Sequence, residues 1–293
     1  MIERLKSVAR ELLPTSIYAP LRARHIYRLI TAYEPRTVEH VYAGHRLRIH
    51  LEDPLAEGWY DRDWLEPAEI TEMRRGRLGD GALVFDVGAH QAVVALILAR
   101  IVGEAGTVVA VEAEPHNARI AQRNVQENDA RNVVVLDAAV GSKTGRLSFT
   151  ESLNGHVAAA GHPGAIEVDA LTVDALAAAH GRPDVVLVDV EGYEEHVLAG
   201  ATATIATAAT DFLIELHSAE LLGAAGSTAD DVLGHFEGRP YELAVALADD
   251  TVPGLASSDL LTAWQPASAK IHSSGRRCFV IARAAGDTAT PSA

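Results

Sequence analysis

Two carboxylates, Asp86 and Glu112, follow apolar runs and are the first residues in the chain whose spacing suggests chemistry. Asp86 is followed by the turn residue Gly88, the segment 93–102 has an apolar helical pattern, and the run 108–111 leads into Glu112. A buried strand, a glycine turn, a helix and a second strand ending in an acid form half of a nucleotide-binding unit. Because such an acid can accept hydrogen bonds from both ribose hydroxyls, the pattern predicts an adenosine-containing cofactor.

The number and spacing of glycines in the turn distinguish between the candidate cofactors. A dinucleotide-binding turn needs G-x-G-x-x-G so that the backbone can approach a pyrophosphate. Here Gly88 is followed by His90, Gln91 and Ala92, so a nicotinamide cofactor is disfavoured. S-adenosylmethionine has no phosphate and needs less clearance. The segment 86–89 resembles the first motif of class I methyltransferases, whose turn holds the amino-acid end of that cofactor, although an ordinary strand and turn is the simpler alternative.

A second group of acids follows the apolar run 184–188. Asp189, Glu191 and Glu194 open a predicted helix. The helix dipole favours acids at this position by ~0.3–1 kcal/mol each, so simple capping is one explanation. Asp189 differs because it lies at the predicted strand end, beside the presumed cofactor turn. There it could bind the cofactor by neutralising its sulfonium or ammonium group, or act as a base.

The elements that position these residues alternate between strand and helix from residue 83 onward. This order predicts an α/β fold with a mostly parallel sheet and helices on both faces, and ligands bind at the carboxyl ends of such strands. The acids at the predicted strand ends therefore share one edge; they are Asp86, Glu112, Asp137, Asp189 and Glu215. They would repel one another unless they bind a cation or hydrogen-bond donors.

We expect three parts in the chain. Residues 79–285 form a Rossmann-like domain with a seven-stranded sheet, residues 1–78 form a cap of helices and a β-hairpin, and residues 286–293 form a frayed tail. The hairpin is predicted from the alternating pattern at 46–51. The basic start of the chain could pack on the core, cover a substrate or touch a membrane surface. Aromatic residues before the main domain could cover a binding site or simply pack in the core; they are Trp59, Tyr60 and Trp64.

The order of motifs resembles the FkbM-type methyltransferases between residue 83 and about 218. Residues 189–200 are similar to the family signature D-x-E-G-x-E-x-x-V-L-x-G, and four further segments line up with family motifs in the same order, namely 111–115, 137–141, 171–174 and 214–217. The resemblance implies the class I methyltransferase fold, S-adenosylmethionine as cofactor and S-adenosylhomocysteine as product. It also implies that Asp137 and Ala138 lie beside the adenine.

The chain departs from the family pattern at two positions. His90 stands where members usually carry asparagine in G-A-N-x-G, and it could keep a polar contact with the cofactor in place of that asparagine. Leu187 stands where many members have a lysine, two residues before Asp189. Neither change abolishes cofactor binding on physical grounds, but both leave the chemistry of the acceptor side open.

Methyl transfer from a sulfonium requires alignment of the acceptor and, for an alcohol, removal of a proton. The candidate catalytic groups are Asp189 and His217, and an unshifted histidine pKa near ~6.5 would suit a base. Asp189, Glu215 and His217 could instead hold a divalent cation, since oxygen and imidazole ligands permit it. We expect no metal ion as the first interpretation.

Composition limits the remaining functions. The net charge of −15 makes free nucleic acid an unlikely partner. The single cysteine, Cys278, excludes an internal disulfide and a multi-cysteine metal site. No apolar run reaches the roughly 18 residues of a membrane helix. The start lacks the apolar core of a signal peptide, so a cytoplasmic location is expected.

The combined prediction is an S-adenosylmethionine-dependent methyltransferase acting on a hydroxyl of a small molecule or sugar. The resemblance implies natural-product or glycan tailoring. Two alternatives stay open: an N- or carboxyl-methyltransferase on the same scaffold, and a noncatalytic cofactor-binding partner subunit. A homo-oligomer formed through the N-terminal helices is also open.

Overall fold

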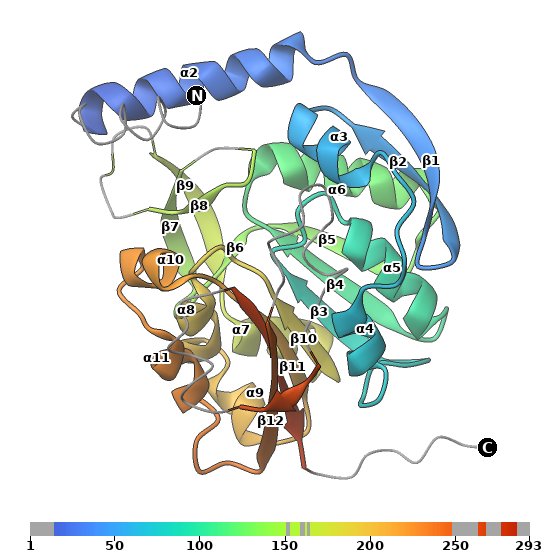
Figure 1. Ribbon diagram of the computed structural model, residues 1–293, viewed down its shortest axis with the longest axis vertical. Helices are drawn as coiled ribbons and strands as arrows, with labels where there is room; N and C mark the ends of the chain where they lie inside the picture. Colours follow the sequence, from blue (N-terminus) through green and yellow to red (C-terminus); the bar gives the residue numbers. More distant parts are fainter. Residues whose placement is uncertain are drawn as a thin grey trace.

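Figure 1 shows the computed structural model of the chain. The structure describes residues 15–150, 153–158, 162, 165–247, 263–267 and 277–285. The first piece of the predicted N-terminal helix and the predicted tail 286–293 lie outside the described residues. Part of the segment 151–165, whose Gly, Asn, His and Ala content is typical of a loop, lies outside them as well.

The centre of the fold is an eight-stranded sheet with the order β13-β12-β14-β11-β10-β3-β4-β5. Neighbouring strands from β11 to β5 run parallel, whereas β14 is antiparallel to both β11 and β12. The predicted mostly parallel α/β sheet is thus confirmed. The strands are β3 (Leu83–Val87), β4 (Thr107–Glu112), β5 (Val133–Asp137), β10 (Val185–Val188), β11 (Asp211–Leu216), β12 (Tyr241–Leu247), β13 (Gln265–Pro266) and β14 (Cys278–Ala284).

The seven predicted strands are all present, and the eighth, β13, corrects their number. It is a two-residue strand that pairs with the outer edge of β12. A single pair of residues, one of them proline, has no apolar alternation, which is why the sequence pattern missed it.

Helices cover both faces of this sheet (Figure 1). Side chains alternate along β3, so Val84 belongs to one buried core while Phe85 and Val87 belong to the other. The first core contains α5 (Val93–Val102) and the inward face of α6 (Pro115–Glu127). The second core contains α7 (Val173–His180), α8 (Glu194–Ala199), α9 (Thr202–Ala206) and α11 (Ala229–Gly234). Because both faces are covered, β10 can be apolar along its whole length.

The segment before the main sheet packs into the first core. After α2 (Thr15–Ala32), β1 (Arg36–Tyr42) and β2 (His45–Leu51) pair as an antiparallel hairpin. Leu47, Ile49 and Leu51 are fully buried together with residues of α5. Next come α3 (Pro54–Tyr60), capped by the Asp53 carboxylate, and α4 (Ala68–Met73).

A second sheet has the order β6-β9-β7-β8. It consists of β6 (Ala139–Val140), β7 (Gly145–Thr150), β8 (His156–Val157) and β9 (Ala165–Leu171). The loop-like segment 151–165 therefore contains a short strand, β8, which pairs with β7. The remaining helix is α10 (Ala219–Ala224), which follows β11. Within the described residues, no helix combines the length and the apolar character needed to cross a membrane.

Candidate active site

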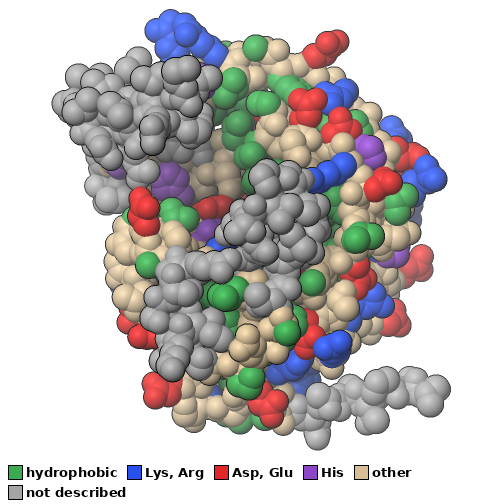
Figure 2. Space-filling model, viewed as in Figure 1, with side chains coloured by type: hydrophobic (Ala, Val, Ile, Leu, Met, Phe, Trp, Pro, Cys, Tyr) green, Lys and Arg blue, Asp and Glu red, His purple; other side chains and the backbone are tan. Residues whose placement is uncertain are grey.

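A cavity of about 710 Å³ lies at the carboxyl ends of β3, β4, β10 and β11. Its lining combines the turn after β3, the residues after β5, aromatic side chains of α3 and the loop 154–157. On the face shown in Figure 2, histidine and acidic side chains lie around a recess. The predicted edge of the parallel sheet therefore lines a cavity in the structure.

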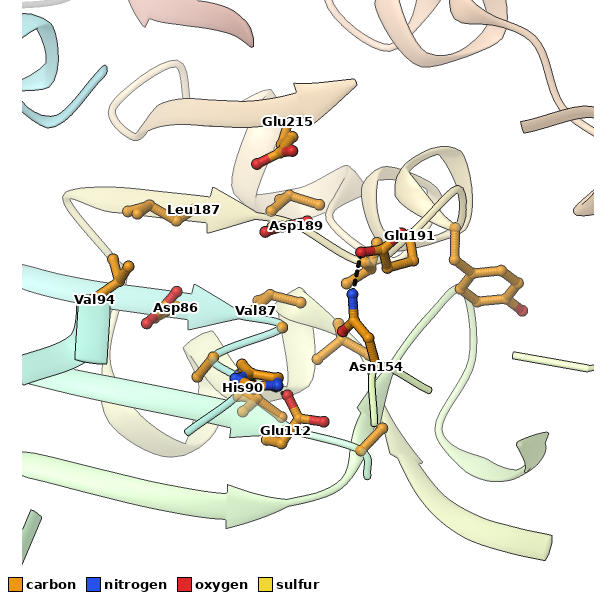
Figure 3. Close-up of a pocket in the computed structure, with 18 of the residues that line it drawn as sticks. Asp86, Val87, His90, Val94, Glu112, Asn154, Leu187, Asp189, Glu191 and Glu215 are labelled. Carbon is orange, nitrogen blue, oxygen red and sulfur yellow. Dashed lines mark hydrogen bonds between the residues drawn. The ribbon is translucent and has the colours of Figure 1, made fainter. Parts of the chain in front are cut away.

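Asp86 lies inside β3, one residue before the strand ends, and its side chain is 5% exposed. Burial raises the pKa of this carboxyl to about 7. Its Oδ2 atom is buried and has no hydrogen-bond partner among the described residues. Figure 3 shows the Asp86 carboxyl beside β3, among the side chains that line the cavity. An unpaired buried acceptor is costly, so this atom is suited to a donor on a bound ligand.

Gly88 is required because two strand ends approach each other here. Its φ is +90°, a region that favours glycine, and its N–H donates to the carbonyl of Val111 at 2.9 Å. A Cβ atom at this position would lie 1.8 Å from the carbonyl oxygen of Asp189. The glycine therefore gives clearance to the backbone of Asp189.

His90 connects three segments of the chain. Its backbone N–H donates to Glu112 Oε2 at 2.7 Å, its Nδ1 lies 2.8 Å from the Tyr60 hydroxyl, and its Nε2 lies 3.3 Å from the Leu153 carbonyl. A carbonyl only accepts, so Nε2 carries the proton and Nδ1 accepts from Tyr60. Burial lowers the pKa of His90 to about 4, which keeps the ring neutral. Both ring nitrogens thus have partners within the protein, while His90 also lines the cavity, and its polar contact with a cofactor stays a prediction.

Glu112 is the acid at the end of β4, and it also lines the cavity. One oxygen accepts from the His90 N–H and the other from the Glu114 N–H, each at 2.7 Å. Burial raises its pKa to about 7, although the backbone hydrogen bonds act in the opposite direction. We call residues 86–90 together with Glu112 the cofactor turn, after the role that the sequence predicts for them.

Of the two residues predicted beside the adenine, Asp137 and Ala138, only Ala138 lines the cavity. Ala138 is buried and lines the cavity. Asp137 is exposed and is not among the lining residues. Asp137 pairs with Glu112 across the sheet, so it does lie at the predicted edge, but its side chain does not reach the cavity.

A buried histidine, His217, stands at the centre of the second group of acids. Its Nδ1 lies 2.7 Å from Oε1 of Glu194, a fully buried carboxylate that also accepts the Gly192 N–H at 2.9 Å. Its Nε2 lies 3.4 Å from Glu191 Oε2, 3.7 Å from Asp189 Oδ1 and 3.9 Å from Glu215 Oε1. We call these residues the acidic cluster: Asp189, Glu191, Glu194, Glu215 and His217. Figure 3 shows three of its acids at the ends of β10 and β11.

The charge on His217 differs from the sequence expectation. Burial lowers its pKa, but the hydrogen bond to Glu194 and the charges of Asp189 and Glu191 outweigh that effect and raise it to about 10. The ring is then an imidazolium at neutral pH and cannot accept a proton. The unshifted pKa assumed from the sequence is therefore wrong, because four carboxylates surround one ring.

Asp189 is the most exposed member of the acidic cluster, and it lines the cavity together with Glu191 and Glu215. Its side chain is 51% exposed, and the space it meets is the cavity that it lines. Its enclosure by protein and the nearby charge of Glu215 raise its pKa well above the usual range, while His217 acts in the opposite direction. A carboxylate with a raised pKa is a better base near neutral pH.

Two residues of the site, Asn154 and Arg277, carried no readable signal in the sequence. Asn154 donates to Glu191 from the glycine-containing loop, and Arg277 donates to Glu215 from the position just before β14 (Figure 3 shows the first of these). Trp59, Tyr60 and Trp64 line the cavity. Of these, Tyr60 is buried and Trp59 is 37% exposed, so the predicted aromatic stretch both packs in the core and covers the site.

Comparison with known proteins gives a family match over more than half of the chain. Residues 86–243 match the model of the methyltransferase FkbM domain. A probable cobalt-precorrin-6B C(15)-methyltransferase (decarboxylating) of Sulfolobus acidocaldarius is 33% identical over 72 residues, which is 25% of this chain and 38% of that protein. The chain thus matches less than two thirds of the length of this relative.

Solved structures show weaker likenesses. The methyltransferase FkbM from Methylobacillus flagellatus is 17% identical, with 68% of this chain and 43% of that chain covered at a TM-score of 0.43. The precorrin-6y C5,15-methyltransferase from Geobacter metallireducens is 13% identical, with 75% and 89% covered at a TM-score of 0.42.

Proposed function

The chain belongs to the FkbM methyltransferase family, and on that premise we propose that it transfers a methyl group from S-adenosylmethionine to an oxygen atom of a small molecule or sugar. One observation carries the proposal: a single cavity joins the cofactor turn to the acidic cluster. A cofactor held by the first would present its methyl group toward an acceptor held by the second. The family resemblance supports a role in natural-product or glycan tailoring.

The residues of the cofactor turn fit S-adenosylmethionine. The unpaired Oδ2 of Asp86 can accept from the ammonium group of the cofactor. Each oxygen of Glu112 accepts one backbone N–H and retains a lone pair for a ribose hydroxyl. Ala138 supplies a small apolar surface for the adenine. When bound, the cofactor supplies an electrophilic methyl group on a sulfonium.

The residues of the acidic cluster must then align the acceptor oxygen and remove its proton. Asp189 faces the cavity and has a raised pKa, so it is the group placed to take that proton. The acceptor oxygen bonds to the methyl carbon as the carbon–sulfur bond breaks, and the hydroxyl proton passes to Asp189. His217 keeps its own proton and orients the surrounding carboxylates by its charge.

The lining of the cavity supports a hydroxyl on a ring-shaped molecule. Trp59 presents an exposed aromatic surface beside the cavity, and such surfaces stack against flat ligand faces. The acids of the cluster would repel a carboxylate acceptor. An oxygen acceptor without negative charge is therefore favoured over a carboxyl group.

The test is methyl transfer to a panel of hydroxylated sugars and phenols, amines and carboxylic acids, followed by product mass. Asp189→Asn keeps the shape of the side chain but removes the base, so turnover is expected to fall by about 10²-fold or more. Asp169→Asn is the matched control, because Asp169 is a surface aspartate, 68% exposed, on β9. Transfer to amines or carboxylates alone would refute a hydroxyl acceptor. Unchanged turnover in Asp189→Asn would refute the base.

A further inference from the structure

We propose that Asp189, Glu215 and His217 form a binding site for a divalent metal ion that holds the acceptor hydroxyl. The sequence alone favoured a site without metal, and the geometry points to the alternative. The three residues come from the ends of β10 and β11, where the parallel strands meet the cavity. Binding of the ion is independent of the proposed function, whereas its role in methyl transfer rests on it.

The spacing of the three side chains matches the coordination shell of a cation. One ligand atom from each residue lies within 4.8 Å of the others. Divalent ions hold oxygen and nitrogen ligands at roughly 2.0–2.6 Å, so two ligands of one ion are less than about 5 Å apart. The three atoms can therefore reach one ion with small side-chain movements.

His217 supplies a second observation, which is independent of the acids. The side chain is 6% exposed, and Nε2 makes no hydrogen bond to any described residue although it points among three carboxylates. Nδ1 is bound to the buried Glu194 carboxylate. Histidines that bind metals usually donate their other ring N–H to a carboxylate, which fixes the tautomer. With the Nδ1 proton held by Glu194, an ion would take the place of the Nε2 proton among the three carboxylates, and Nε2 would then bind the ion.

The charges around the site are unbalanced without an ion. Asp189, Glu191 and Glu215 face Nε2, and Glu194 lies on the other side of the ring. The cation beside Glu215 is Arg277, which donates to its Oε1 atom. We expect the metal on the other oxygen of Glu215, with Arg277 remaining in place. Glu191 is held by Asn154 and lies at the edge of the site.

The position of Asp189 leaves one side of the ion open. Half of its side chain faces the cavity that also contains the cofactor turn. A hydroxyl bound to a divalent ion loses its proton more readily, and that proton would pass to water in the open cavity. The acceptor oxygen then bonds to the methyl carbon as the carbon–sulfur bond breaks. With the ion bound, Asp189 is a ligand instead of the proton acceptor.

The ligand types favour a transition metal. Carboxylates suit Mg²⁺, Ca²⁺ and Mn²⁺, while the imidazole is better suited to first-row transition ions. We therefore choose Mn²⁺ as the probe, because it accepts both kinds of ligand and its free form is counted directly by electron paramagnetic resonance.

The experiment titrates the chelator-treated full chain with Mn²⁺ and follows the free-ion signal. One bound ion per chain is expected. Glu215→Gln and Asp189→Asn should weaken that binding by about 100-fold, and Glu194→Gln by roughly 10–100-fold, since it keeps both acceptor contacts but makes the histidine a weaker ligand. The matched control is Glu237→Gln, an exposed glutamate outside the cavity, which should bind Mn²⁺ like the unaltered chain.

Calorimetry with S-adenosylmethionine on the same samples separates the two proposals. Cofactor binding and chelator-resistant methyl transfer without Mn²⁺ binding would overturn the metal site and leave the methyltransferase. Mn²⁺ binding that is lost in the ligand variants would support the site even if no cofactor bound. Equal Mn²⁺ binding in Glu215→Gln, Asp189→Asn and the control would place the ion elsewhere and overturn the proposal.

Discussion

The cofactor turn and the acidic cluster both bring carboxylates to the ends of parallel strands, but they hold them in different ways. In the cofactor turn, Glu112 is held by two backbone N–H groups and Asp86 by burial alone, which raises its pKa to about 7. In the acidic cluster, the acids surround a charged side chain, His217. The first region is suited to hydroxyl and ammonium donors of a ligand. The second is balanced by Arg277 together with a proton on His217 or a metal ion.

The change with the largest expected effect breaks the contact between the two regions. Gly88→Ala would place a Cβ 1.8 Å from the Asp189 carbonyl, so either the cofactor turn or the end of β10 must move. We expect loss of cofactor binding and a fall of about 3 kcal/mol or more in the free energy of unfolding, measured by denaturant titration. The control is Gly81→Ala, which has a similar φ of +78° but open space around it, and should cost only about 1 kcal/mol. Equal effects of the two variants would contradict the close approach.

The pH dependence of stability tests the neutral histidine of the cofactor turn. The folded pKa of His90 is about 4, below its unfolded value of about 6.5, so the unfolded chain takes up the proton first as the pH falls. Its contribution is present above pH ~6.5 and is lost between that value and pH ~4, by up to about 3 kcal/mol. Denaturant titrations at several pH values should show this loss relative to His90→Gln. A constant difference between the two proteins across this window would show that His90 does not titrate in this way.

The smallest effect is expected at the aromatic edge of the cavity. Trp59→Ala removes a partly exposed ring that lines the cavity next to the His90 ring but leaves the carboxylates of both regions in place. The KM for a ring-shaped acceptor should rise about 10-fold, in line with one aromatic contact, while the affinity for S-adenosylmethionine stays the same. A change in cofactor affinity alone would assign this tryptophan to the cofactor side of the cavity.

The sequence predicts the strands and their order better than it predicts the side-chain arrangement of the site. Strands follow from apolar patterns over a few neighbouring residues, whereas the site depends on contacts between residues that are far apart in the chain. Apolar runs such as those of β3 and β10 determine strands locally, and the parallel order then brings Asp86, Asp189 and Glu215 to one edge. Side-chain direction is a finer property. Asp137 shares that edge with Glu112, yet it is exposed outside the cavity.

Contacts between residues far apart in the chain could not be predicted in the same way. The pKa of His217 depends on Glu194, and the neutrality of His90 depends on its burial beside Tyr60. Each partner is an unremarkable residue by type, and only the fold brings it within hydrogen-bonding distance. The reason for Gly88 is similar, because its close neighbour is the carbonyl of Asp189.

The most direct test of the account is calorimetric titration of the protein and of Glu112→Ala with S-adenosylmethionine, S-adenosylhomocysteine and NAD. We predict that both sulfur cofactors bind, that NAD does not, and that Glu112→Ala weakens binding by about 100-fold through loss of charged hydrogen bonds to the ribose. Circular dichroism of the variant controls for its folding, since Glu112 also holds two backbone N–H groups. Binding of NAD alone, or binding of the sulfur cofactors that Glu112→Ala does not change, would contradict the assignment of this cavity.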